Sequence, residues 1–189
     1  MALVVLYIAI DIVLQVLSPQ YSVLSDAESD LAVGPLGWAM QVNFAARAVM
    51  SACVVAVVSL TAPDSRLRRV GSVLLALAGL CSAALVFFPT DVNRAGEFGM
   101  TPRTTVGLVH VVFATSGFLA VLAAMAMLTW WIGRLPAVGT LFVVACAGLG
   151  VLAISLAVLP QVVGLAERLC LAGILGWTFV LCRGLRRSA

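Results

Sequence analysis

Long apolar stretches occupy most of this chain, and short polar segments separate them. The apolar stretches are the ranges 2–17, 38–60, 70–88, 105–132, 138–159 and 165–182. A helix needs roughly 20 apolar residues to cross a bilayer, so six such helices nearly exhaust the 189 residues. Only 10% of the residues are charged, whereas a soluble domain carries roughly 25%. We therefore predict an all-α fold, with residues 1–189 forming one polytopic membrane domain, a six-transmembrane-helix bundle.

The positions of the arginines predict how this bundle is oriented. Short cytoplasmic loops of membrane proteins carry an excess of Lys and Arg. With both termini in the cytoplasm, the only arginines in the outer segments are Arg94 and Arg103, in the same loop as Glu97. The inner segments then hold Arg66, Arg68, Arg69, Arg134, Arg183, Arg186 and Arg187. The expected topology is N-in and C-in, in a multi-pass protein of the plasma membrane.

The first apolar stretch is predicted to be a retained helix. It lacks the basic start and the small-residue cleavage pattern of a signal peptide. It also carries Asp11 and Gln15, which lie one turn apart and share one face of a helix. A polar face of this kind is expected to point into the bundle.

Several polar side chains are placed at or near the outer ends of the spans. A charge at membrane depth is costly, so such residues face the bundle interior and find partners. We expect them to converge on one outer-facing polar site that binds or transforms a ligand. The acid or base candidates are Asp30, Asp91, His110 and Glu167, and the substrate-binding candidates are Asp11, Asn43, Arg47 and Arg168.

Structural roles remain open for most of these residues. Asp91 follows a Pro-Thr pair and fits a turn or helix cap. Glu167 and Arg168 fit a lock between a loop and a helix, because a carboxylate is favourable near a helix N-terminus. Arg47 fits a structural partner of Asp11 or Asp30. His110 fits a hydrogen-bonded interior residue.

Metal and cofactor sites are not expected. His110 is the only histidine, which excludes a bis-histidine haem, and a zinc site would need it together with carboxylates alone. The five cysteines all lie inside the apolar stretches and form no C-x-x-C pair. The absence of lysine excludes a Schiff base. Nucleic acid is not an expected partner either.

The order of several short motifs resembles a known family. These are Ser18-Pro19-x-Tyr21, Ser29-Asp30-Leu31, Phe88-Pro89-Thr90-Asp91, His110, and Gly164-Leu165-Ala166-Glu167-Arg168. Together they resemble the domain-of-unknown-function 998 family of prokaryotic membrane proteins, over nearly the whole chain. The resemblance implies six helices and a polar cluster at the outer face, and it brings no established activity.

Three functions are compatible with these features. The first is binding or acid–base conversion of a lipid-like or isoprenoid amphiphile at the outer leaflet. The second is a non-catalytic accessory subunit that contacts membrane partners helix to helix. The third is a small carrier, which is disfavoured because the sequence shows neither an inverted repeat nor a pair of broken helices.

Overall fold

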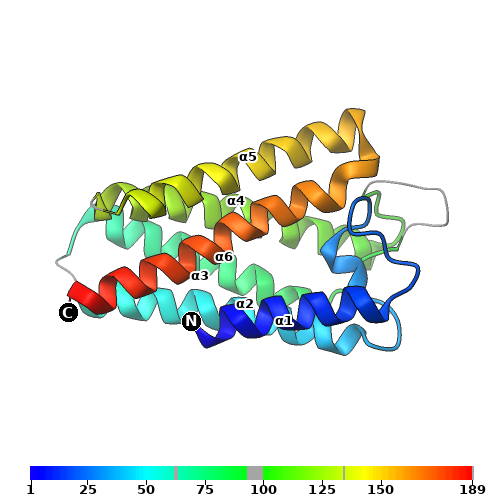
Figure 1. Cartoon of the computed structure of the whole chain (residues 1–189), viewed down its shortest axis with the longest axis horizontal. Coiled ribbons are helices and arrows are strands. Elements are labelled where there is room, and N and C mark those ends of the chain that lie inside the picture. Colours follow the sequence, from blue (N-terminus) through cyan, green and yellow to red (C-terminus); the bar gives the residue numbers. More distant parts are fainter. Residues whose placement is uncertain (62–63, 93–99, 134, 189) are drawn as a thin grey trace.

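The computed structural model describes residues 1–61, 64–92, 100–133 and 135–188. All regular structure in this part of the chain is helical, in the order α1 (Ala2–Leu17), η1 (Glu28–Ala32), α2 (Gly37–Thr61), α3 (Arg66–Leu85), α4 (Thr105–Ile132), α5 (Pro136–Val158), η2 (Pro160–Val162) and α6 (Val163–Ser188). The predicted Arg94, Glu97 and Arg134 lie outside the described residues. The six long helices form an elongated bundle (Figure 1). The all-helical membrane fold predicted from the apolar stretches is therefore confirmed.

Five of the six long helices are long and apolar enough to cross a membrane, and α1 is the exception. Its 16 residues match the expected range 2–17 but rise only about 24 Å, less than the roughly 30 Å of a hydrocarbon core. In Figure 1 the helix starts part-way along the bundle, beside α2, and runs towards the end that carries η1.

Three helix boundaries differ clearly from the prediction. The third helix starts at Arg66 rather than at residue 70, because the Ser65 side chain accepts a hydrogen bond from the Arg68 backbone N–H and caps the helix. It ends at Leu85 rather than at residue 88. The sixth helix continues through the terminal arginines to Ser188, beyond the expected residue 182.

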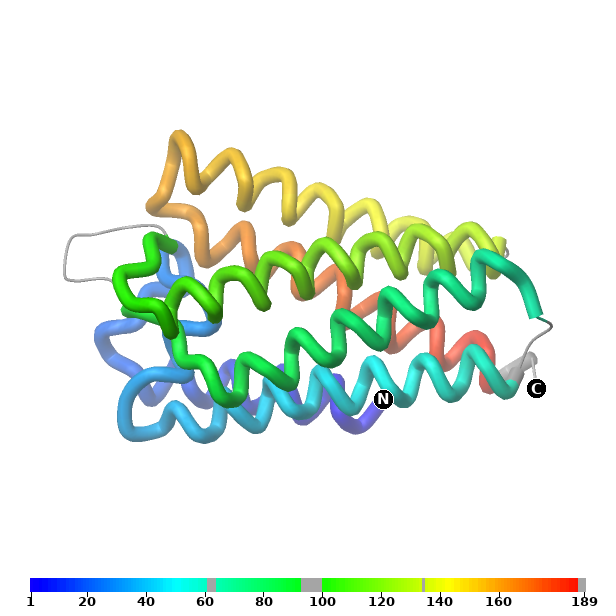
Figure 2. Tube along the Cα trace, turned by 180° about the vertical axis from the view of Figure 1, so that it is seen from behind, coloured from blue at the N-terminus to red at the C-terminus, as the bar shows by residue number. Residues whose placement is uncertain are grey.

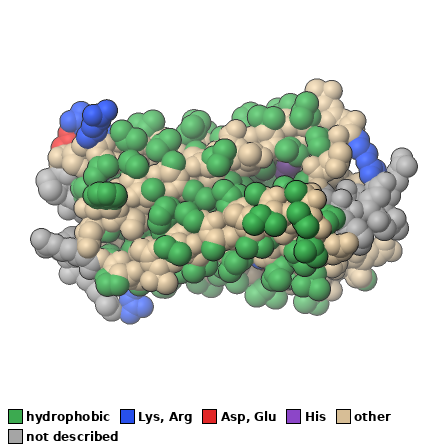
Figure 3. All heavy atoms as spheres, turned by 90° about the horizontal axis from the view of Figure 1, so that it is seen from above, with side chains coloured by type: hydrophobic (Ala, Val, Ile, Leu, Met, Phe, Trp, Pro, Cys, Tyr) green, Lys and Arg blue, Asp and Glu red, His purple; other side chains and the backbone are tan. Residues whose placement is uncertain are grey.

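The two ends of the bundle differ in their side chains. The arginine end carries the α2–α3 connection, the start of α3 and the end of α6, with Arg66, Arg69 and Arg183. The loop end carries η1 and the segment that follows α3. Between the ends, hydrophobic side chains spread over the face shown in Figure 3. This surface is what a protein needs to contact lipid along its sides.

The main hydrophobic core lies in the half of the bundle next to the arginine end. Trp177, Met125, Leu128 and Leu181 are fully buried there. The Trp177 indole N–H donates to the Thr129 hydroxyl at 2.9 Å, which satisfies the one polar group of this side chain. Around this core α2, α3 and α4 pack side by side and α5 packs on α6. Helices α4 and α5 meet at their connection and diverge towards the loop end (Figure 2).

Candidate functional site

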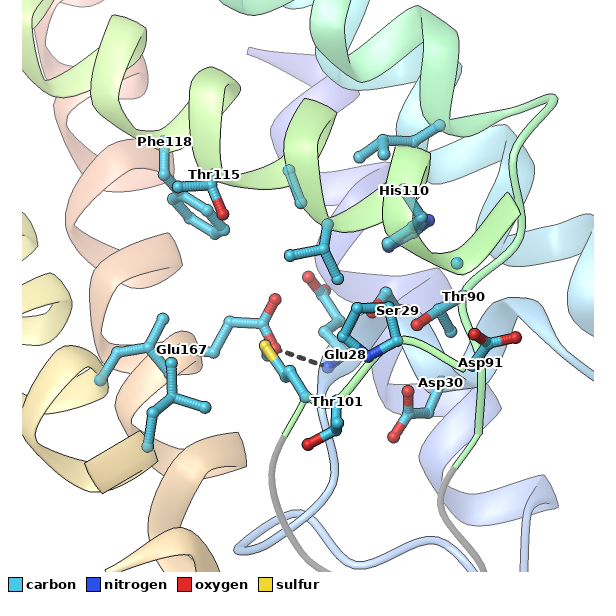
Figure 4. Close-up of a pocket in the computed structure, with 18 of the residues that line it drawn as sticks. Glu28, Ser29, Asp30, Thr90, Asp91, Thr101, His110, Thr115, Phe118 and Glu167 are labelled. Carbon is cyan, nitrogen blue, oxygen red and sulfur yellow. Dashed lines mark hydrogen bonds between the residues drawn. The ribbon is translucent and has the colours of Figure 1, made fainter. Parts of the chain in front are cut away.

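A cavity of about 280 Å³ lies in the half of the bundle next to the loop end. Helices α2, α4, α5 and α6 and the short helix η1 all contribute to its walls. Of the residues singled out from the sequence, it is lined by Asp30, Arg47, Asp91, His110 and Glu167. The structure thus brings together all four acid or base candidates and one of the substrate-binding candidates. Figure 4 shows the side chains of Asp30, Asp91, His110 and Glu167 around the cavity.

Glu28 is a cavity residue that the sequence interpretation missed. Its side chain is only 2% exposed, and one carboxyl oxygen accepts a hydrogen bond from the Tyr7 hydroxyl at 2.7 Å. Its backbone N–H donates to the Glu167 carboxylate at 2.7 Å, the bond drawn as a dashed line in Figure 4. One signal could have revealed it. Residues three apart eclipse in a 3₁₀ turn, so Glu28 shares the buried face of Leu31.

The two carboxyl groups of η1 have raised pKa values. Burial, followed by the charges of Asp11 and Glu167, raises the pKa of Glu28 from 4.5 to about 8. Burial, followed by the charges of Glu167 and Asp26, raises the pKa of Asp30 from 3.8 to about 7. Desolvation and like charge both disfavour the ionised form. Near neutral pH the site therefore holds carboxyl groups that keep or share a proton.

Arg47 lies at the deep end of the cavity, between two aromatic rings. Its guanidinium carbon is 5.9 Å from the ring centroid of Phe44 and 5.9 Å from that of Phe118. The guanidinium also interacts with the Tyr7 hydroxyl and, electrostatically, with Glu28. The structure therefore gives Arg47 different partners from the Asp11 or Asp30 suggested by the sequence. Arg47 and Phe118 also line a second cavity of about 50 Å³, so they lie between the two spaces.

His110 presents an unused hydrogen-bond acceptor. The residue is 2% exposed, and its Nδ1 lies 2.7 Å from the Phe88 carbonyl oxygen. A carbonyl oxygen only accepts, so Nδ1 carries the hydrogen and Nε2 is left with a lone pair. Nε2 has no hydrogen-bond partner among the described residues.

Asp91 sits at the exposed rim, where it organises the start of α4. Its carboxylate accepts hydrogen bonds from the backbone N–H groups of Arg103 at 2.7 Å and Thr104 at 2.8 Å, and from the Thr104 hydroxyl at 2.9 Å. The bonds from Thr104 and Arg103 hold its pKa below the usual value. Thr104 in turn caps α4 by accepting from the Gly107 N–H. This bonding fits the capping role that the sequence left open.

The other substrate-binding candidates lie outside the cavity lining. Asp11 accepts a hydrogen bond from Gln15 at 2.6 Å, as their spacing predicts, and its other oxygen is 3.9 Å from the Arg168 guanidinium. Asn43 is fully buried and donates to the Tyr7 backbone carbonyl at 3.1 Å. These contacts fasten α1 to its neighbours.

Arg168 holds the loop before η1 on α6. Its guanidinium donates to the carbonyls of Val23 at 3.3 Å and Asp26 at 3.4 Å, hydrogen-bonds the Tyr21 hydroxyl, and lies over the Tyr21 ring. The Tyr21 hydroxyl itself donates to the Ala27 carbonyl at 3.0 Å. This arrangement is the lock between loop and helix that the sequence left as an alternative, and it positions Glu28 over the cavity.

Within the described ranges, no three His, Cys, Asp or Glu side chains are grouped as metal ligands would be. The site offers a set of carboxyl groups and one imidazole acceptor at the polar end of the cavity, and one guanidinium, that of Arg47, at its deep end.

Comparison with known proteins matches nearly the whole chain to one family. The family model described as "Protein of unknown function (DUF998)" matches residues 1–184. No curated protein gives a significant match. No solved structure does so either.

Proposed function

The chain belongs to the DUF998 family, whose description assigns no activity, and from its site we propose that it binds a membrane amphiphile. In this proposal the polar head group lies against η1, Glu167 and His110, and the apolar chain lies between α4 and α5. The observation that carries the proposal is the division of the cavity into a polar end and an apolar remainder.

The apolar remainder is formed mainly by α4 and α5. Phe118, Leu119, Leu149, Leu152 and Leu156 line it. Burying an aliphatic chain against such side chains is favourable by about 0.8 kcal/mol per CH₂ group. The hydrocarbon core of a bilayer stabilises the same chain to a similar extent, so little of this free energy favours binding. The polar end of the cavity must therefore distinguish one amphiphile from another.

The depth of the cavity fits one leaflet. From the start of α4 at Thr105 to Leu119 the helix rises about 21 Å at 1.5 Å per residue. Half of a hydrocarbon core is about 15 Å, to which the head-group region adds several ångströms. The cavity thus extends from head-group level at η1 to about the bilayer midplane.

An opening towards the lipid lies between α4 and α5. Leu119 and Leu156 line the cavity, yet they are 58% and 45% exposed. Side chains that line a cavity and are also exposed lie at the rim of that cavity. Helices α4 and α5 diverge towards this end of the bundle (Figure 2). An amphiphile could therefore enter sideways from the leaflet without leaving the membrane.

Conversion of the bound amphiphile is a second candidate function, favoured by Glu28. A carboxyl group with a pKa of about 8 still carries its proton at neutral pH and can act as a general acid. Glu167, bonded to the Glu28 backbone, could accept the proton in return.

Blocking the opening tests the binding proposal. Ala153→Trp places an indole at the cavity rim on α5, and Ala147→Trp places the same group on the exposed surface of that helix, away from the lining. Native mass spectrometry of protein purified from membranes should show a bound amphiphile in the wild type and in Ala147→Trp, and a loss of most of it in Ala153→Trp. Equal retention by both variants would contradict the proposal. Absence of any bound amphiphile, together with a co-purifying membrane protein, would favour the accessory function.

A further inference from the structure

The charges around the cavity indicate which head group it accepts, an inference that rests on the proposed function. Glu28, Asp30 and Glu167 line the polar end, and Arg47 is the cationic side chain among the described lining residues. Asp91 adds a fourth carboxylate at the rim, but its oxygens already accept three hydrogen bonds. Apart from Asp91, the described lining of the cavity therefore has more acidic than basic side chains.

The nearby Arg168 does not offset this excess of acidic side chains. Its guanidinium donates to loop carbonyls and lies 3.9 Å from Asp11, outside the cavity lining. Asp11 and Arg168 together are formally neutral. The raised pKa values of Glu28 and Asp30 report the same excess, since neighbouring carboxylates contribute to both after burial.

A second observation comes from the hydrogen-bonding capacity of the site. The buried His110 lines the cavity, and its Nε2 is an acceptor with no partner among the residues described. A buried polar atom without a partner is costly, and a ligand that donates a hydrogen bond would remove that cost. A carboxylate or a fully ionised phosphate head group has no such hydrogen.

We propose that the cavity selects an amphiphile with a protonated amine head group, which donates to His110 and on binding stabilises the ionised forms of the Glu28, Asp30 and Glu167 carboxyl groups. An alcohol could make the same hydrogen bonds without the charge, so it should bind less well. Among the described lining residues, an anionic head group would face three carboxyl groups and one guanidinium, that of Arg47, which is held between two aromatic rings.

Three photoreactive probes with one hexadecyl chain can test this selectivity. They differ only in the head group, which is a primary amine, an alcohol or a phosphate, and each carries a diazirine near the end of its chain. The protein is reconstituted in phosphatidylcholine nanodiscs, and labelling is mapped by peptide mass spectrometry. Labelling of residues 111–119 and 149–156 is divided by labelling of the exposed α3 residues Val73, Leu77 and Leu80. This ratio cancels differences in membrane partitioning between the probes.

The amine should give a ratio about tenfold higher than the phosphate, which corresponds to about 1.4 kcal/mol, with the alcohol between them. In the double variant Glu28→Gln/Asp30→Asn the amine ratio should fall to that of the alcohol. Asp64→Asn removes a carboxylate at the arginine end, where Asp64 pairs with Arg68, and should leave all ratios unchanged.

The outcomes separate the head-group inference from the proposed function. Equal ratios for the three probes, each above one, would overturn the amine preference and leave amphiphile binding intact. A higher ratio for the phosphate would also overturn it. No enrichment of any probe would overturn both. Because the comparison of probes uses the wild-type protein, the test holds even where the double variant fails to fold.

Discussion

The carboxyl group of Glu28 is buried among ionisable groups from three helices. Tyr7 and Asp11 face it from α1, Arg47 from α2 and Glu167 from α6. Burial outweighs the favourable contacts with Arg47 and Tyr7, so the pKa rises to about 8. A single side chain thereby links the protonation state of the site to the stability of the fold.

This linkage predicts a pH-dependent stability. Between pH 4.5 and about 8 the folded protein keeps the Glu28 proton, whereas the unfolded chain has lost it. Stability should therefore be highest below this window and decrease as the pH rises through it. Glu28→Gln keeps the shape and the acceptor for Tyr7, so it should reduce the slope of melting temperature against pH in nanodiscs. The remaining slope is expected from Asp30, whose pKa is raised in the same direction.

Asp64→Asn is the matched control for this measurement. Hydrogen bonding to Arg68 lowers the pKa of Asp64, so its contribution to stability is present at neutral pH and is lost on acidification. Its removal should not reduce the slope between neutral and alkaline pH. A Glu28→Gln profile parallel to that of the wild type would show that the carboxyl group titrates normally.

At the level of single residues the sequence predicted neighbours within one helix better than contacts between distant segments. The spacing of Asp11 and Gln15 predicted that they share one helix face, in agreement with their hydrogen bond. Glu28 was missed because it lies in a polar loop, where its inward direction depends on a short 3₁₀ turn. That turn is held by Arg168 and Glu167, which come from the far end of the chain. No local pattern encodes such a contact.

Among the elements, η1 and its preceding loop are joined to α6 by close backbone contacts. The Leu165 backbone N–H donates to the Leu24 carbonyl at 3.1 Å, so the loop also satisfies the start of this helix. A Cβ atom added at Gly164 would lie 2.3 Å from the Asp26 carbonyl oxygen and 2.8 Å from that of Val23. Glycine at this position allows the loop to approach α6.

Gly164→Ala should therefore push the loop away from α6. Overpacking of this kind costs about 1–3 kcal/mol. We expect faster hydrogen exchange across residues 21–33 and a lower melting temperature. Gly150→Ala is the control, since a Cβ added there has nothing within 4 Å. Unchanged exchange in Gly164→Ala would mean that the loop and α6 are not tightly docked.

Helix positions followed from the sequence more closely than helix packing did. The apolar stretches predicted each long helix, because burial and lipid contact both require apolar side chains. Glycine spacing alone did not identify the contact face of α5. A Cβ atom at Gly148 would meet the Cys170 backbone at 2.3 Å, whereas Gly150, two residues on, faces open space. The rotation of one helix against another depends on both partners.

For the whole molecule, the two halves of the bundle differ in packing. The half near the arginine end has a continuous core around Trp177 and Met125. The half near the loop end holds the larger cavity, and the acidic and imidazole groups lie there. A ligand taken from one leaflet would thus be held in the half that faces this leaflet, while the other half keeps the helices together.

The orientation of the bundle decides which leaflet that is. Arg66 and Arg186 lie at the arginine end, which the excess of arginine in short loops predicts to be cytoplasmic. In a cysteine-free background, Arg66→Cys and Arg186→Cys should react with a membrane-impermeant maleimide only after the inner face is opened. Leu24→Cys, at an exposed position of the loop end, should react in intact cells. The reverse pattern would place the cavity in the inner leaflet, so the amphiphile would then be one that the cytoplasmic side supplies.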